Sequence, residues 1–313
     1  MSRVLLTRRI PSSVLGLLEA EQTVDLYTGE GAIPRAELLR RVADKEALIC
    51  LLTDKIDGEV MDAAPALKIV ANIAVGYENL DVPAARKRGI IMTNTPDVLT
   101  EAVAEFTWAL ILGIARRVTE GDRLVRSGEW NRWGLDFMLG MELRGKQLGI
   151  IGAGRIGRAV AAKAPAFGMK VVFARPKRGA PSAKDDMSLD ELLVTSDVVS
   201  IHAPSTPETR HLINKRTLAR MKRSAILVNT ARGSLVDEEA LAWALAEHLI
   251  AGAALDVYER EPGIQPALKD FENVVLAPHL GSATRETRTA MAELAVRNVL
   301  AVLKGEKPLT PVT

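Results

Sequence analysis

The chain has 313 residues, enough for two domains that each bury a core of their own. Its 41 basic and 39 acidic side chains give a net charge of +2, and this balance offers no electrostatic case for binding nucleic acid or a membrane surface. The single cysteine, Cys50, cannot form an intrachain disulfide, and the longest strongly apolar run, 106–115, is far shorter than the roughly 20 residues of a membrane-spanning helix. The basic start of the chain lacks the apolar stretch of a signal peptide, so we expect a soluble cytoplasmic protein.

Short β-branched segments alternate with longer segments of helical periodicity almost from end to end, which is typical of a parallel α/β architecture. In the first third of the chain, strands are predicted at 4–7, 23–27, 48–52, 68–74 and 90–93. Residues 34–42 are predicted to be helical, because Pro34 is well tolerated at the first helical position. The strands are almost continuously apolar, as expected for a sheet with both faces covered.

The segment 100–127 carries apolar residues at helical spacing along its whole length. A helix of that length extends about 40 Å, more than one small domain needs. Such a helix is a candidate for bridging domains or subunits. The alternative is a long core helix that bends at Gly113 or Gly121.

A second α/β series begins after a linker at 127–143. Its predicted strands are 147–151, 170–174, 198–202, 226–229, 252–257 and 274–277. With the helices between them, these strands make a complete doubly wound sheet. The final predicted helix, 285–303, follows the last strand, whereas the N-terminal series lacks a closing helix. We therefore predict that the chain returns to the first domain, which makes that domain discontinuous.

The clearest motif is the glycine-rich run GAGRIG at 152–157, which opens a predicted helix at 155–167 directly after a predicted strand. In such a motif Gly152 permits a tight turn, Gly154 lets the backbone approach a pyrophosphate, and Gly157 allows close packing of helix on strand. The amides at the start of the helix then face the phosphates. Glycine turns are common, but the position between a strand and a helix favours a dinucleotide site over a purely structural turn.

The end of the next predicted strand indicates which dinucleotide binds. A carboxylate about 20 residues beyond the glycines would bind the ribose 2′-hydroxyl and favour NAD. The sequence instead has Arg175, Pro176, Lys177 and Arg178 directly after Ala174, with three cations and no carboxylate. Guanidinium groups pair well with a 2′-phosphate. The run is either a solvated basic turn or a site for NADP. We favour NADP, with NAD as the alternative.

Three ionisable residues follow late strands of the second series. Arg232 comes after the strand 226–229, and Glu261 and His279 come after the next two strands. Open α/β sheets bind ligands outside the carboxyl ends of their strands, so we expect these side chains to converge. Histidine can hold and release a proton near neutral pH, a carboxylate favours the imidazolium, and arginine grips a carboxylate with two bonds. The set suits the reduction of a 2-oxo acid, whereas each residue alone would be a surface or packing residue.

With these residues in view, the sequence resembles the D-isomer-specific 2-hydroxyacid dehydrogenases, and most closely their glyoxylate and hydroxypyruvate reductase branch. The segments that carry the resemblance are NIAVGYENLD at 72–81, NTPDV at 94–98, the glycine motif, NTARG at 229–233, ALDVYEREP at 254–262 and PHLGS at 278–282. They occur in the order of the family and cover essentially the whole chain.

The resemblance implies a catalytic set of Arg232, Glu261 and His279. Arg232 and His279 would also contact the substrate, together with Leu52 and the backbone amides of Val75 and Gly76. The residues implied to bind the cofactor are Gly152, Gly154, Arg155, Ile156, Gly157, Arg175, Pro176, Lys177, Arg178, Ala203, Pro204, Thr209, Thr230, Ala231, Asp256 and Gly281. Among them, Asp256 would meet the nicotinamide carboxamide. No metal is implied.

The resemblance also implies two Rossmann-like parallel-sheet domains, one flavodoxin-like and one doubly wound, separated by an active-site cleft. The expected substrate-binding domain is discontinuous, at 1–96 and 284–313, and the expected NAD(P)-binding domain is 97–283. Hinges are expected near 95–98 and 281–284. Family members are homodimers joined through their cofactor domains, with the segment 100–127 taking part.

The expected reaction is reduction of glyoxylate or hydroxypyruvate to glycolate or D-glycerate by NADPH, with His279 as the general acid. One departure is Phe137, which aligns where the reductase branch often has a tryptophan, and this leaves the preferred substrate size open. Formate dehydrogenases share the fold but pair a glutamine with the histidine. The sequence also leaves open the oxidation of phosphoglycerate, or a corepressor-like binding protein that senses NAD(H).

Overall fold

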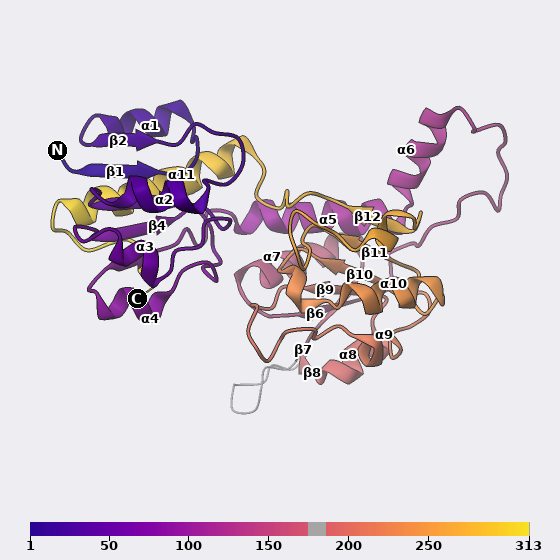
Figure 1. Ribbon diagram of the computed structural model, residues 1–313. Coiled ribbons are helices and arrows are strands. Elements are labelled where there is room, and N and C mark those ends of the chain that lie inside the picture. The colour runs from indigo at the N-terminus through magenta and orange to yellow at the C-terminus, as the bar shows by residue number, and fades with distance from the viewer. Residues whose placement is uncertain (175–185, 313) are drawn as a thin grey trace. The chain divides into compact units, whose positions relative to one another are not determined.

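The computed structural model describes residues 1–174 and 186–312. The chain divides into two compact units, Met1–Leu99 with Ala283–Thr313, and Thr100–Ser282. In the described part of the chain, one unit holds a five-stranded sheet and the other a seven-stranded sheet (Figure 1). The predicted α/β fold with two parallel sheets is confirmed.

The sheet of the first unit has the flavodoxin-like order β2-β1-β3-β4-β5, and its neighbouring strands are parallel. The strands are β1 (Arg3–Leu6), β2 (Thr23–Leu26), β3 (Ala47–Cys50), β4 (Ile69–Asn72) and β5 (Ile91–Thr93). Each lies within one residue or so of a predicted apolar run, although the runs at 48–52 and 68–74 extend past the ends of the strands.

Helices cover both faces of this sheet. They are α1 (Ser12–Glu19), α2 (Arg35–Val42), α3 (Gly58–Asp62), α4 (Val82–Lys87) and α11 (Arg285–Leu303). Because successive strand residues face opposite sides, Leu5 packs with α2, α3 and α4, whereas Val4 and Leu6 pack with α1 and α11. The C-terminal helix α11 therefore belongs to the core of the N-terminal unit, where Figure 1 shows it in yellow among indigo strands.

The sheet of the second unit has the order β12-β11-β10-β9-β6-β7-β8, again with parallel neighbours. Its strands are β6 (Gln147–Ile151), β7 (Lys170–Ala174), β8 (Asp186–Met187), β9 (Val198–Ile201), β10 (Ile226–Asn229), β11 (Gly252–Leu255) and β12 (Val274–Leu276). The strand order reverses at β6, between β7 and β9, and this makes the sheet doubly wound. The two-residue edge strand β8 was not predicted.

One face of this sheet packs against α5 (Thr100–Ala115) and α7 (Arg155–Lys163). The other face packs against α8 (Leu189–Thr195), α9 (Lys215–Leu218) and α10 (Glu238–Ala246). The short 3-10 helices are η1 (Ala164–Phe167), η2 (Gly233–Leu235) and η3 (Pro266–Lys269). The predicted helix 155–167 is thus α7 followed by η1.

The prediction of one continuous helix over 100–127 is wrong. The segment forms α5 and a separate helix α6 (Val118–Ser127). The break falls at Arg117, which has a left-handed backbone with φ of 54°, and not at Gly113 or Gly121.

Helix α5 ends at Ala115 because residues 140–141, which follow α6, come back to contact its last turn. The Met141 amide donates to the Ala115 carbonyl at 2.7 Å, so this carbonyl is satisfied from outside the helix. Gly140 permits the approach, because a Cβ there would lie 2.4 Å from the same carbonyl oxygen. The helix α6, described in full, has no buried residue and projects from the rest of the second unit (Figure 1).

No helix in residues 1–174 or 186–312 combines the length and the apolar character that crossing a membrane requires.

Candidate active site

The glycine turn lies between β6 and α7, at the reversal of strand order where open α/β sheets bind ligands. Gly152 has φ of 109°, and a Cβ there would lie 2.5 Å from the Ala203 nitrogen. A Cβ on Gly157 would lie 2.1 Å from the Gly152 oxygen. Gly154 differs, since no described atom lies within 4 Å of its Cβ position and the residue is exposed. Packing therefore demands two of the glycines, while Gly154 leaves an open surface.

This open surface fits the pyrophosphate of a dinucleotide. Gly154 is the N-cap of α7, and no described side chain caps the helix there. The backbone amides in the first turn of α7 include those of Arg155 and Ile156. They therefore lie at the kind of helix start that binds phosphate. The neighbouring loop after β9 is closed by Thr209, whose hydroxyl donates to the Pro204 carbonyl at 2.7 Å. Arg175, Pro176, Lys177 and Arg178 lie outside the described residues.

Arg232 sits just beyond the carboxyl end of β10, in a turn shaped by the buried side chain of Asn229. The Asn229 side chain accepts the Ala231 amide at 3.1 Å and donates to the Arg232 carbonyl at 2.9 Å. The Thr230 hydroxyl is anchored to the Thr107 hydroxyl of α5 at 2.9 Å, in a buried position. The Arg232 guanidinium donates to the Ala231 carbonyl at 2.7 Å. Both bonds of Asn229 fix the backbone that carries the predicted catalytic cation.

Glu261 and His279 form a hydrogen-bonded pair at the same edge of the sheet. His279 Nδ1 lies 2.8 Å from Glu261 Oε2, with each side chain a little over one third exposed. The second carboxylate oxygen, Oε1, accepts the Tyr258 amide at 3.0 Å. Because Nδ1 is directed at the carboxylate, Nε2 is the ring nitrogen left to face a substrate.

Glu261 is held in its ionised form. Burial raises the pKa of its carboxyl, but the hydrogen bond from His279, the Tyr258 amide and the charge of Arg232 outweigh this effect, so the pKa lies below its ordinary value. The ionised carboxylate lies 2.8 Å from His279 Nδ1, so it fixes the orientation of the ring and leaves Nε2 for proton transfer. The pair can therefore hold a proton at Nε2 and deliver it.

A buried carboxylate fixes the turn that carries His279. The two oxygens of Asp256 accept the amides of Leu280 at 2.6 Å and Gly281 at 2.8 Å. His279 has φ of 56°, a left-handed conformation in which histidine is enriched among the non-glycine residues. Burial raises the pKa of the Asp256 carboxyl, while the amides of Leu280 and Gly281 act in the opposite direction. Asp256, predicted only as a cofactor contact, thus also shapes the histidine turn.

The predicted carboxylate-binding backbone lies in the first unit, after β4. The Asn94 side chain donates to the Val75 carbonyl at 2.8 Å, and the Asn72 side chain donates to the Gly76 carbonyl at 2.9 Å. In a trans peptide the carbonyl and the following N–H point in opposite directions, so the Gly76 amide faces away from Asn94. Leu52 lies two residues beyond the end of β3. The two asparagines begin the motifs at 72–81 and 94–98 and were given no role from the sequence; the structure shows that they orient this loop.

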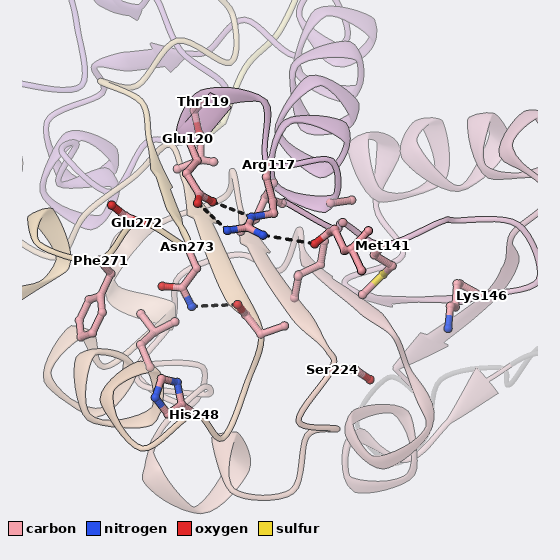
Figure 2. Close-up of a pocket in the computed structure, with 18 residues that line it drawn as sticks. Arg117, Thr119, Glu120, Met141, Lys146, Ser224, His248, Phe271, Glu272 and Asn273 are labelled. Atoms are coloured by element: carbon pink, nitrogen blue, oxygen red, sulfur yellow. Dashed lines mark hydrogen bonds and ion pairs between the residues drawn. The ribbon is translucent and has the colours of Figure 1, made fainter. Parts of the chain in front are cut away.

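A cavity of about 660 Å³ lies at a different place in the second unit, and Figure 2 shows the side chains that line it. It is lined by Ile226, the first residue of β10, and by Asn273, just before β12, so it lies at the amino-terminal edge of the sheet. Arg117 pairs there with Glu120 at 2.5 Å. The cavity is therefore separate from the strand ends that carry the catalytic candidates.

Doubly wound sheets bind dinucleotides where the strand order reverses, and in this protein the glycine turn lies at that reversal, with the histidine–carboxylate pair at the same edge. A family model described as "D-isomer specific 2-hydroxyacid dehydrogenase, NAD binding domain" matches residues 108–281. The chain is 51% identical over 315 residues to a glyoxylate reductase of Thermofilum pendens, covering 98% of the chain and 93% of that relative. The chain belongs to the D-isomer-specific 2-hydroxyacid dehydrogenase family, in its glyoxylate reductase branch.

Solved structures agree with this assignment. A protein of Thermus thermophilus is 50% identical with a TM-score of 0.93, and the match covers 99% of this chain and 100% of that one. An NADPH-dependent glyoxylate/hydroxypyruvate reductase of Sinorhizobium meliloti, solved with NADP and malonate, is 36% identical with a TM-score of 0.88, covering 100% of this chain and 97% of that one. The protein is thus an NAD(P)-dependent dehydrogenase that acts as a 2-oxo acid reductase.

Proposed function

We propose that the protein reduces glyoxylate and hydroxypyruvate to glycolate and D-glycerate and prefers NADPH as the cofactor. The observation that carries the proposal is the 2.8 Å contact between His279 and an ionised Glu261 at the strand ends that also hold Arg232. When bound, NADPH supplies the hydride that the C2 carbon of the substrate accepts.

The side chains supply the rest of the chemistry. Protonated His279 donates from Nε2 to the carbonyl oxygen as the C2 carbon is reduced, so one hydride and one proton convert the 2-oxo acid to the 2-hydroxy acid. Glu261 stabilises the imidazolium before the transfer and sets the orientation of the ring. Arg232 polarises the carbonyl and anchors the acid.

We also propose that the first unit binds the substrate and the second binds the cofactor. Val75 and Gly76 would hold the substrate carboxylate through their backbone amides, beside Leu52. The preference for NADPH is supported by the cations at 175, 177 and 178 in the sequence and by the NADPH-dependent relative of Sinorhizobium meliloti.

The test is a panel of 2-oxo acids assayed in parallel with NADPH and NADH, together with the variants Arg232→Ala and His279→Ala. We expect turnover of glyoxylate and hydroxypyruvate, a higher kcat/KM with NADPH, and a large loss in both variants. Wild-type turnover in the His279 variant would remove this residue from the mechanism. Oxidation of formate or phosphoglycerate with no 2-oxo acid reduced would favour those dehydrogenase activities, and no turnover of any kind would favour a cofactor-sensing binding protein.

The second unit also supports a homodimer. The helix α6 and the segment after it expose large apolar side chains, namely Val118, Val125, Trp130, Trp133, Leu135 and Leu139. We call residues 118–139 the arm. An exposed set of large apolar side chains like the one on this arm is typical of a protein–protein interface. We propose that two copies of the chain associate through this arm, which contains Phe137. The mass in solution, measured by light scattering, tests the proposal.

A further inference from the structure

We infer that Glu238 is a positioning residue that fixes the loop carrying Glu261. The inference rests on the proposed role of Glu261. Glu238 is the first residue of α10 and is only 6% exposed. One of its oxygens accepts the Glu259 amide at 2.7 Å, and the other accepts the Gln265 amide at 2.9 Å.

These two amides belong to the two stems of one tight loop. Glu259 lies two residues before Glu261 and Gln265 lies four residues after it, so a single carboxylate ties both ends of the segment. Inside the loop the Gly263 amide donates to the Arg260 carbonyl at 2.7 Å, which closes the hairpin. Glu238 therefore fixes the stems, while the hairpin fixes the tip.

The chemistry of this position calls for a carboxylate. Hydrogen bonds from amides to an ionised acceptor are shorter and stronger than those to a neutral one. A glutamine offers one acceptor oxygen, and its NH2 group would face the second backbone N–H, so one stem would lose its bond. The loop would then move relative to the turn that carries His279.

The position of Glu261 matters because it meets charged groups from several directions. It contacts His279 at 2.8 Å and the Tyr258 amide at 3.0 Å, and the charges of Arg232 and Asp256 act on the same pair. A shift of the loop weakens the support of the imidazolium without touching the substrate. Loss of Glu238 should therefore act chiefly through Glu261.

The test is a double-mutant cycle of Glu238→Gln and Glu261→Gln, measured as kcat/KM for glyoxylate reduction. Glu239→Gln is the matched control, since this neighbour on α10 is exposed and the substitution removes the same charge. A displacement of about 1 Å at a catalytic group costs up to 10²-fold in rate, so we expect Glu238→Gln to lower kcat/KM roughly 10- to 100-fold. The loss should appear in kcat, with the KM for glyoxylate unchanged, because Glu238 does not touch the substrate. In the Glu261→Gln background the same substitution should have almost no effect.

The outcomes separate the inference from the proposed function. Full activity of Glu261→Gln would overturn the proposed role of Glu261 itself. An impaired Glu261→Gln variant beside a fully active Glu238→Gln variant would overturn only the inference, as would additive losses in the cycle. Thermal unfolding and the affinity for NADPH identify a variant that has lost its fold.

A second variant decides the matter if Glu238→Gln does not fold. Gln265 has φ of −56°, which proline adopts, so Gln265→Pro removes one amide donor while Glu238 stays. We expect a several-fold lower kcat/KM with an unchanged affinity for NADPH. Wild-type kinetics in this variant would overturn the inference.

Discussion

The contact between the Arg232 turn and the Glu261 loop depends on the absence of a side chain at Gly233. A Cβ at this position would lie 1.8 Å from the carbonyl carbon of Tyr258 and 2.4 Å from the nitrogen of Glu259. Ordinary contact begins at 3.4 Å, so the backbones must separate by about 1.6 Å to accept Gly233→Ala. A displacement of this size between catalytic groups costs on the order of 10²-fold in kcat/KM. We therefore expect Gly233→Ala to lower kcat/KM for glyoxylate reduction by on the order of 10²-fold.

The control is Gly113→Ala, the same chemical change in the middle of α5. No described atom lies within 4 Å of the Cβ position there, and alanine in a helix interior stabilises by about 0.5–1 kcal/mol relative to glycine. This variant should keep wild-type activity and melt at a slightly higher temperature. The reasoning is refuted if Gly233→Ala folds, binds NADPH and keeps wild-type kcat/KM.

Three further predictions concern the catalytic pair, the half-buried phenol of Tyr258, and helix α6 with the segment after it. Glu261→Gln removes the ionised acceptor that orients His279, so kcat/KM for glyoxylate should fall about 10²-fold; an unchanged kcat/KM contradicts the pairing. Burial raises the pKa of Tyr258 to about 12, so the stability from its protonated form is present below about pH 10 and lost towards pH 12. In thermal unfolding, the stability of the wild-type protein relative to Tyr258→Phe should therefore decrease between about pH 10 and pH 12. A stability difference that stays constant over this pH range would contradict the prediction. If two copies associate as proposed, Trp133→Ser should weaken the association about 30-fold in sedimentation, for a loss of about 2 kcal/mol, whereas Leu17→Ser, exposed on α1, should leave it unchanged.

Much of the sheet architecture could be predicted because it depends on local sequence. The strands Gln147–Ile151 and Lys170–Ala174 have their predicted bounds, since each is an almost continuous apolar run. The break at Arg117 could not be predicted in the same way. It depends on the Met141 amide, which reaches the end of α5 only after the chain has turned back.

The same distinction holds for the candidate site. Arg232, Glu261 and His279 follow the ends of predicted strands, so their position at one edge of the sheet follows from topology. Glu238 was missed because its partners are backbone amides 21 and 27 residues further along the chain. A backbone donor has no side-chain identity, so such a bond leaves no pattern in the sequence.

The return of α11 to the first unit has a consequence for the order of folding on the ribosome. The strands of that unit are made first, but one of their apolar faces is covered by residues Ala292, Ala295, Val296 and Val299. Domains usually fold as they emerge, N-terminal first. Here the inserted unit, Thr100–Ser282, can complete its core while the unit around it still waits for its last helix. The strands synthesised first therefore complete their core only after α11 has emerged, later than the unit that is inserted between them.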